Sequence, residues 1–280
     1  MLKNFNEMLL RARKAPYAVG SFNVYNYETM KGVVLAAKET GQAAIIAFGA
    51  KYLSNMSLAG AVSMARTLCC EYGIEACLHL DHCSGIDTIY RAIQAGFSSV
   101  MYDGSALPFA ENIANTARVC EAAHSCGVSV EAELGSLAAT ETSHEGSAND
   151  REAYTSPKAA CDFVRESGCD ALAVSIGTVH GLYTARPNVR IDLLKEIRAL
   201  VDIPLVLHGG SGIPEEIIRD CIRNGICKIN VNTEISAYAV EKTKELLGAA
   251  KAPHLAVVAE NQQQYVKDVV LKYIRFFTSV

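Results

Sequence analysis

The sequence predicts a closed barrel of eight parallel strands, each followed by a helix, over one domain that spans residues 1–280. Two observations predict it. Short apolar runs alternate with amphipathic stretches from end to end, and this unit occurs eight times. No low-complexity linker divides the chain, and barrels of this length often form one domain. The expected fold is therefore the (β/α)8 or TIM barrel.

Eight short, mainly apolar runs are the candidate strands. In chain order they are Ala18–Phe22, Ala43–Phe48, Ala76–Leu80, Ser99–Tyr102, Val128–Leu134, Ala171–Ser175, Pro204–His208 and Lys228–Val231.

The stretches between these runs have helical periodicity. They are Glu28–Glu39, Leu58–Tyr72, Ile86–Ala95, Phe109–Ser125, Pro157–Glu166, Ile191–Leu200, Glu215–Arg223 and Glu234–Leu247. Pro157 and Pro214 stand where a first helical turn begins. Glycines such as Gly41 and Gly168 follow the ends of predicted helices, as C-terminal glycines do.

Three further segments complete the prediction. Gly135–Tyr154 and Gly177–Arg190 are longer than ordinary loops, which favours a functional role such as a lid. The tail Asn261–Phe277 is expected to form an added helix whose apolar face closes the barrel base or meets another subunit. An open doubly wound sheet is the alternative fold, and the lack of a Gly-rich dinucleotide fingerprint after the first strand disfavours it.

Composition limits the function classes. The formal net charge is -4, which argues against nucleic acid as a partner, and no window is apolar enough for a transmembrane helix. The N-terminus lacks the apolar stretch of a signal peptide. The ten cysteines include no CxxC pair and are expected to be free thiols in a reducing compartment, so we expect a cytoplasmic protein.

Polar residues follow most of the predicted strands. In a TIM barrel the carboxyl ends of the strands meet at the rim that carries the active site. The residues at six consecutive strand ends are Asp81 and His82, Asp103, Glu133, His180 and Gly181, His208 to Ser211, and Asn230 to Thr233.

Three of these strand-end residues are histidines, His82, His180 and His208. Three imidazoles suit a catalytic Zn²⁺ and leave a coordination position open for substrate. Asp81 is interpreted as a general acid/base or as an orienting partner of a histidine. Asp103 and Glu133 would hold a second metal position or tune the first.

The turn His208-Gly209-Gly210-Ser211-Gly212 precedes Pro214, which opens a helix. Backbone N–H groups in such a turn can hold a phosphate, and the loops after strands seven and eight are the usual phosphate site of TIM barrels. Asn230 to Thr233 would add further donors.

At these residues the chain resembles the class II, zinc-dependent ketose-bisphosphate aldolases. The matching segments are Ser21–Val24, Leu78–His82, Ser99–Ser105, Val130–Gly135, Gly177–Tyr183, Leu207–Gly212 and Lys228–Glu234. The resemblance runs from about residue 5 to about residue 247.

The resemblance implies reversible cleavage of a ketose 1,6-bisphosphate to dihydroxyacetone phosphate and glyceraldehyde 3-phosphate. Fructose 1,6-bisphosphate is the favoured substrate. The resemblance also implies that His82, His180 and His208 hold zinc, that Asp81 accepts the C4 hydroxyl proton, and that Glu141 exchanges the C3 proton. Asp103 and Glu133 match an alternative metal position. The residues implied to bind the substrate are Asn23, Gly181, Gly209, Gly210, Ser211, Asn230, Val231, Asn232 and Thr233. A monovalent cation, Na⁺ or K⁺, binds near the phosphate in many members.

The sequence departs from the family pattern in two places. Ala138-Ala139-Thr140 stand before Glu141 where the family has two glycines, and Thr184 follows Tyr183 where many fructose-bisphosphate members have lysine. The candidates for binding the second phosphate of the substrate are Lys51, Arg186 and the C-terminal region.

Several alternatives stay open at this stage. The substrate is alternatively tagatose 1,6-bisphosphate, a deoxy-keto-gluconate phosphate or another phosphoketose. A Schiff-base aldolase would use Lys228 as its nucleophile, and a non-catalytic partner subunit is a third class. The expected assembly is a homodimer or homotetramer.

Overall fold

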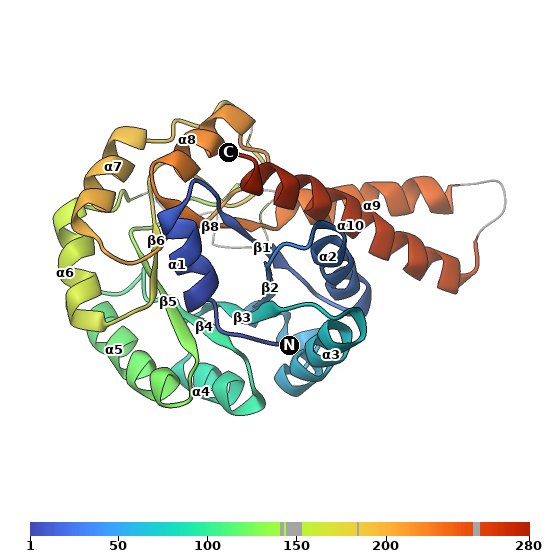
Figure 1. Cartoon of the computed structure of the whole chain (residues 1–280), viewed down its shortest axis with the longest axis horizontal. Coiled ribbons are helices and arrows are strands. Elements are labelled where there is room, and N and C mark those ends of the chain that lie inside the picture. Colours follow the sequence, from blue (N-terminus) through green and yellow to red (C-terminus); the bar gives the residue numbers. More distant parts are fainter. Residues whose placement is uncertain (141–142, 144–152, 184, 249–252) are drawn as a thin grey trace.

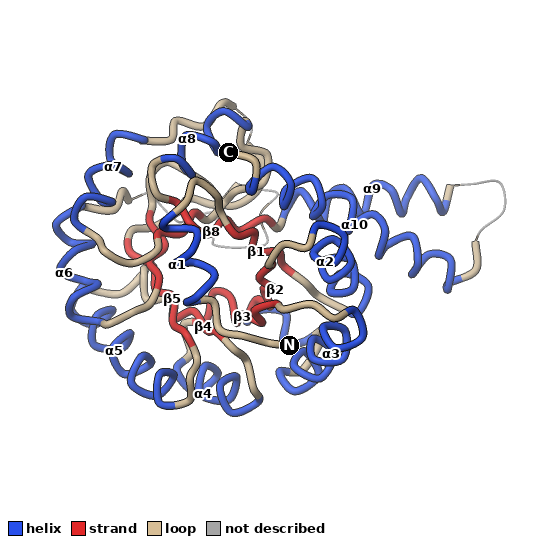
Figure 2. Tube along the Cα trace, viewed as in Figure 1, coloured by secondary structure: helices blue, strands red, loops and turns tan. Residues whose placement is uncertain are grey.

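A computed structural model of the chain shows a closed barrel of eight parallel strands in the order β1-β2-β3-β4-β5-β6-β7-β8 (Figure 2). The structure describes residues 1–140, 143, 153–183, 185–248 and 253–280. The strands are β1 (Val19–Asn23), β2 (Ala44–Gly49), β3 (Ala76–Cys83), β4 (Ser99–Tyr102), β5 (Ser129–Leu134), β6 (Ala171–Val174), β7 (Leu205–Leu207) and β8 (Ile226–Val231). The TIM-barrel prediction is confirmed, and the open-sheet alternative is wrong because β1 pairs with β8.

The eight predicted strands all occur, and most of their ends lie within a residue or two of the prediction. The third is the exception, since it continues through Cys83 instead of ending at Leu80. Its pairing with β4 shifts register between Leu80 and Cys83, so an irregularity carries the strand past the polar residues Asp81 and His82.

Helices surround the barrel as the sequence predicts. They are α2 (Tyr27–Thr40), α3 (Leu58–Tyr72), α4 (Ile86–Ala95), α5 (Phe109–Ser125), α6 (Pro157–Ser167), α7 (Ile191–Leu200), α8 (Glu215–Arg223), α9 (Thr233–Leu247) and α10 (Leu255–Thr278). Two elements were not predicted, the helix α1 (Asn6–Lys14) and the 3-10 helix η1 (Ala50–Ser54). None of the helices within the described residues is long and apolar enough to cross a membrane.

Helix α1 closes the base of the barrel, the end at which the strands begin (Figure 1). Phe5, Leu9 and Ala12 are buried there against barrel residues such as Val19 and Ile45. These three side chains recur at helical spacing, so one face of a short helix covers the apolar lower interior of the barrel. The opposite rim therefore remains as the place for a site.

The tail forms α10, which is longer than predicted and lies on the flank of the barrel rather than over its base. Its apolar residues, among them Val266, Val270 and Ile274, join the core shared with α2. With α9, α10 forms an arm that projects from the barrel (Figure 1). The expectation that the tail closes the base is wrong because α1 occupies that position.

Candidate active site

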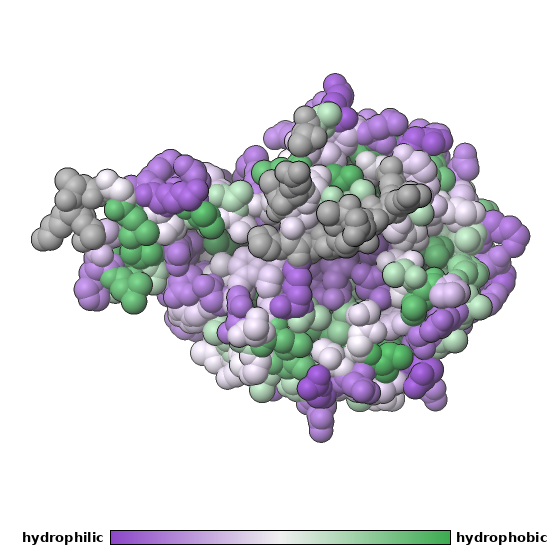
Figure 3. Space-filling model, turned by 180° about the vertical axis from the view of Figure 1, so that it is seen from behind, coloured by the Kyte–Doolittle hydropathy of each residue, from purple (hydrophilic) through white to green (hydrophobic). Residues whose placement is uncertain are grey.

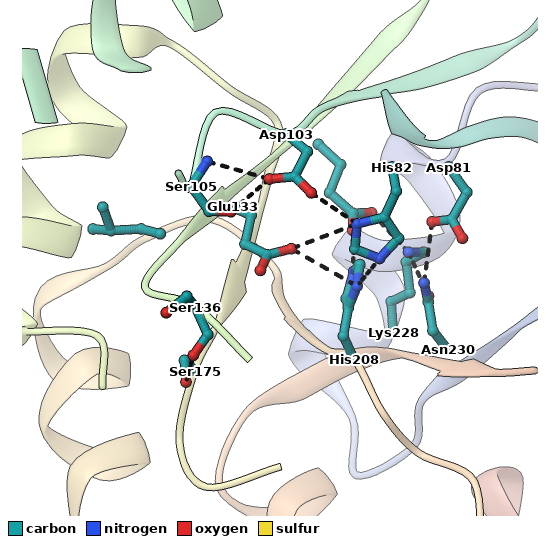
Figure 4. A network of polar contacts seen from close by, with 12 residues as sticks. Asp81, His82, Asp103, Ser105, Glu133, Ser136, Ser175, His208, Lys228 and Asn230 are labelled. Carbon is teal, nitrogen blue, oxygen red and sulfur yellow. Dashed lines mark hydrogen bonds and ion pairs between the residues drawn. The ribbon is translucent and has the colours of Figure 1, made fainter. Parts of the chain in front are cut away.

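Three strands each place two polar side chains, two residues apart, in the barrel interior. They are His79 and Asp81 on β3, Glu131 and Glu133 on β5, and Lys228 and Asn230 on β8, and all six are buried. Figure 4 labels Asp81, Glu133, Lys228 and Asn230 among them. Successive side chains of a strand point to opposite faces, so this spacing directs each pair into the barrel.

His82 reaches the same site although it is the direct neighbour of Asp81. Its φ of 43° lies in the left-handed region, and within the described residues it is the one residue other than glycine with positive φ. The register shift between Leu80 and Cys83 accompanies this backbone conformation. Strain of this kind persists where the surroundings impose it and is concentrated at functional sites.

The three histidines come together at the rim. Each of His82, His180 and His208 offers a ring nitrogen within 4.8 Å of the others. Nδ1 of His82 lies 2.9 Å from the Asp103 carboxylate, and Nε2 of His208 lies 2.8 Å from Glu131. Because a carboxylate accepts, each of these nitrogens carries the hydrogen.

The remaining nitrogens of these two rings then present lone pairs to each other. Nε2 of His82 and Nδ1 of His208 are 2.8 Å apart. Two lone pairs at this distance need a proton or a cation between them. A carboxylate that fixes the far nitrogen of each imidazole is the usual arrangement around a metal-bound histidine, so the donor set fits a divalent metal ion.

Glu133 gives a second indication of a cation. Its Oε2 is buried, has no hydrogen-bond partner among the described residues, and lies 3.9 Å from Nδ1 of both His82 and His208. Burial, together with the negative charge of Asp103, raises the pKa of Glu133 well above its usual range. With His82 and Asp103 it also forms a second group of possible ligands within 4.8 Å.

Asp81 is held by two amides. Asn23 donates to Oδ2 at 2.9 Å and Asn230 donates to Oδ1 at 3.1 Å. Burial raises the pKa of Asp81, but two positive charges outweigh it, so the net shift is downward. They are the charge of Lys228 and that of His82, whose ring is an imidazolium when a proton rather than a metal ion lies between it and His208. The carboxylate is thus kept ionised, as a proton acceptor must be.

Lys228 lies inside the barrel with no exposed surface. Its ammonium group lies 2.8 Å from Oε2 of Glu131 and donates to Oδ1 of Asn230 at 2.7 Å. Burial raises the pKa of Glu131, yet Lys228 and the hydrogen bond from His208 lower it to about 2. A Schiff-base nucleophile must be a free neutral amine, so these ionic contacts argue against the Lys228 alternative.

Sequence reasoning missed Glu131 and the structural role of Lys228. Lys228 fixes Glu131, which orients His208, and it also holds Asn230, which holds Asp81. The two-residue spacing from Glu131 to Glu133, and from Lys228 to Asn230, is the signal that would have placed both inside the barrel.

The predicted phosphate-binding turn follows β7. Gly209 has a φ of +69°, and a Cβ atom there would lie 2.2 Å from the carbonyl oxygen of Val179. Tyr183 braces the same approach, because its hydroxyl accepts from the Val179 N–H and donates to the Gly209 carbonyl, both at 3.0 Å. Gly210 donates to the Asn230 carbonyl at 2.9 Å.

The start of α9 adjoins this turn. Ser211 Oγ accepts from the backbone N–H of Asn232 at 3.2 Å and of Glu234 at 3.3 Å. The strand β8 ends at Val231 and α9 begins at Thr233, so the predicted segment lies at a helix N-terminus.

The long loops meet beside His180. Thr140 donates to the His180 carbonyl at 2.8 Å, and His180 donates to the Ala138 carbonyl at 2.9 Å. Gly181 follows with a φ of +107°. Glu141 and Thr184 lie outside the described residues. A cavity of about 220 Å³ opens at the site, lined by residues that include His82, Asp103, Glu133 and His180.

The fold and the site define a TIM-barrel protein with a candidate metal centre at the carboxyl ends of its strands. The family model described as fructose-bisphosphate aldolase class-II matches residues 3–280. The chain therefore belongs to the class II fructose-bisphosphate aldolase family, and it is a lyase.

Similar proteins agree with this assignment. The chain is 43% identical over 228 residues to the D-tagatose-1,6-bisphosphate aldolase subunit GatY of Klebsiella oxytoca, which covers 81% of this chain and 80% of the relative. The crystal structure of the YdjI aldolase from Escherichia coli K12 is similar, with a TM-score of 0.87 and 33% sequence identity; the match covers 100% of this chain and 98% of that chain. The structure of a putative fructose-1,6-bisphosphate aldolase from Coccidioides immitis has a TM-score of 0.89 and 27% identity, and the match covers 98% of this chain and 95% of that chain.

Proposed function

We propose that the protein reversibly cleaves a ketose 1,6-bisphosphate to dihydroxyacetone phosphate and glyceraldehyde 3-phosphate, with zinc held by His82, His180 and His208. The observation that carries the proposal is the pair of carboxylate-fixed imidazoles, whose free nitrogens face each other beside the ionised Asp81. When bound, zinc would act as a Lewis acid on the carbonyl of the dihydroxyacetone phosphate half.

Asp81 would accept the proton of the C4 hydroxyl. As the C4–O bond becomes a carbonyl, the C3–C4 bond breaks and its electron pair moves toward the C2 carbonyl. Asn23 and Asn230 would keep the carboxylate oxygens in place for this transfer. In condensation Asp81 returns the proton.

The phosphate of the dihydroxyacetone phosphate half would bind at Gly181, at Gly209 to Ser211 and at Asn230 to Thr233. The position of the turn supports this role, because it follows β7 and its Ser211 contacts the N-terminus of α9, and helix N-termini bind phosphate. A monovalent cation, Na⁺ or K⁺, would bind near this phosphate.

Two further roles belong to the same proposal. Glu141 would exchange the C3 proton from the long segment Gly135–Tyr154. Asp103 and Glu133 would provide an alternative metal position, and their grouping with His82 within 4.8 Å supports it.

Two epimers at C4 compete as the substrate. Fructose 1,6-bisphosphate is the substrate that the sequence favours, and the 43% identity to a tagatose-bisphosphate aldolase subunit favours tagatose 1,6-bisphosphate. Comparing kcat/KM for the two bisphosphates, each with a coupled assay for glyceraldehyde 3-phosphate, decides between them. We expect cleavage of at least one; turnover of neither, with metal bound, would contradict the proposal and favour another phosphoketose or a non-catalytic subunit.

The assembly and the compartment are also proposals. We propose a cytoplasmic homodimer or homotetramer formed by one domain per chain. The projecting arm supports self-association, because Tyr238, Val240, Leu247, Leu255 and Val257 on α9 and α10 are exposed apolar residues. Figure 3 shows hydrophobic residues on this arm.

A further inference from the structure

A second cavity lies at the base of the barrel, at the opposite end from the histidine cluster. Its volume is about 490 Å³, and it is lined by α1, α7, α8 and the turns that follow them. These elements lie on the face that Figure 1 turns to the viewer. Five of the lining residues are basic: Arg13, Lys14, Lys195, Arg198 and Arg223.

Little negative charge balances this cluster, although the whole chain has a net charge of -4. Arg13 contacts Asp202 at 3.1 Å, and Asp202 is fully exposed. Across the described ranges, no carboxylate lies within 4.0 Å of Lys14, Lys195 or the other two arginines. The cavity is therefore electropositive.

Two of the five basic residues, Arg13 and Arg198, are half-buried. The side chain of Arg13 is 21% exposed, and its Nε is buried with no hydrogen-bond partner in the described part of the chain. Arg198 lies against Gly225, where a Cβ atom would be 2.5 Å from Arg198 Cδ. Both guanidinium charges oppose the effect of burial on the nearby Cys227 thiol, whose pKa is nevertheless raised to about 11.

Helix ends account for part of this charge. Arg13 and Lys14 lie in the last turn of α1, Arg198 in that of α7 and Arg223 in that of α8. A helix C-terminus carries about half a negative charge. Three such ends and the Asp202 carboxylate still leave an excess of positive charge, and they do not explain an arginine Nε that is buried without a partner.

We propose that this base cavity binds a small phosphorylated metabolite that carries two or more negative charges. Arginine is the side chain that pairs with phosphate oxygens through two parallel hydrogen bonds. The volume lies in the range of small-molecule sites, roughly 300–1,000 Å³, and leaves room for more than one phosphate group. Because the cavity is at the opposite end of the barrel, its ligand would bind without competing with the substrate.

Calorimetric titration of the full chain with inorganic pyrophosphate at low ionic strength tests the proposal. The paired substitutions Arg13→Gln and Arg198→Gln should weaken one binding event at least about tenfold. Arg165→Gln is the matched control, because Arg165 is an exposed arginine of α6. Lys14→Gln with Lys195→Gln, at two exposed positions, gives a second test should the arginine pair unfold.

The active site also binds phosphate in the proposed function, so Ser211→Ala separates the two events. We expect the Ser211→Ala protein to keep the binding of pyrophosphate at the base cavity. We expect the protein with both Arg13→Gln and Arg198→Gln to keep ketose-bisphosphate cleavage in the absence of pyrophosphate.

The proposal is overturned if no saturable binding depends on the base residues, if Ser211→Ala removes all binding, or if Arg165→Gln weakens binding equally. A parallel titration with citrate, expected to bind more weakly, distinguishes phosphate recognition from charge alone; citrate binding as tightly as pyrophosphate would overturn the phosphate assignment.

Discussion

At the scale of single residues, the candidate site depends on carboxylates that fix imidazoles. Asp103 and Glu131 each accept from one ring nitrogen of His82 or His208, and so leave the other nitrogen free for a cation. Lys228 supports Glu131 from inside the barrel. The orientation of the candidate metal ligands therefore depends on buried residues, Glu131 and Lys228, that lie behind the side chains expected to contact the substrate.

Glu131→Gln tests this support. A glutamine can still accept at His208 but removes the negative charge that raises the basicity of the imidazole, so zinc should bind about 10- to 100-fold more weakly. Competition with a chromophoric chelator measures the affinity. Glu121→Gln, at an exposed position of α5, is the control and should leave it unchanged. Unaltered affinity in Glu131→Gln would show that His208 is not oriented in this way.

Asp81→Asn tests the proton transfer. An amide is nearly the same size but cannot accept the C4 hydroxyl proton, so kcat should fall by about 10² to 10⁴ while bound zinc stays near the wild-type amount. Steady-state kinetics and metal analysis of the same preparation measure both quantities. A variant that keeps its kcat would remove Asp81 from the acid/base role.

The sequence predicted the three histidines and Asp81 as site residues because they follow apolar runs that end at one rim. It could not predict that Asp81 and His82 both point into the site, since consecutive strand residues normally face opposite ways. That depends on the irregular backbone at His82, with its φ of 43°. Glu131 was missed because it lies within a strand, where no strand-end rule applies.

At the scale of elements, the unpredicted helix α1 has a structural task. The segment from Phe5 to Lys14 mixes apolar residues with Asn6, Glu7, Arg11 and Arg13, so it does not have the pattern of a buried strand. Helices this short gain most of their stability from tertiary packing. Its place under the barrel follows from the apolar lower interior that it covers, which the linear sequence does not reveal.

Leu9→Ala should therefore destabilise the fold by about 2–5 kcal/mol, because the leucine is fully buried and its removal leaves a cavity. Its neighbour Leu10 is 45% exposed, and Leu10→Ala should change stability by less than about 0.5 kcal/mol. Urea unfolding followed by circular dichroism measures both. Equal effects of the two substitutions would contradict the account of α1 as the closure of the base.

At the scale of the whole molecule, the two candidate sites lie at opposite ends of the barrel. The carboxyl ends of the strands carry the histidine cluster, and the base carries α1 and the basic cavity. The barrel itself was predictable because eight alternating units allow few other topologies. The projecting arm of α9 and α10 was not predictable, because helical periodicity does not show how a helix is oriented relative to the barrel.

The central claim is a metal-dependent aldolase at His82, His180 and His208. Its most direct test is the rate of ketose 1,6-bisphosphate cleavage by chelator-treated protein as Zn²⁺ is added back. The account predicts no measurable cleavage without metal and full recovery near one equivalent of zinc per chain. Full activity in the metal-free protein, with inactivation by borohydride in the presence of substrate, would contradict it and would point to Lys228 as a Schiff-base nucleophile.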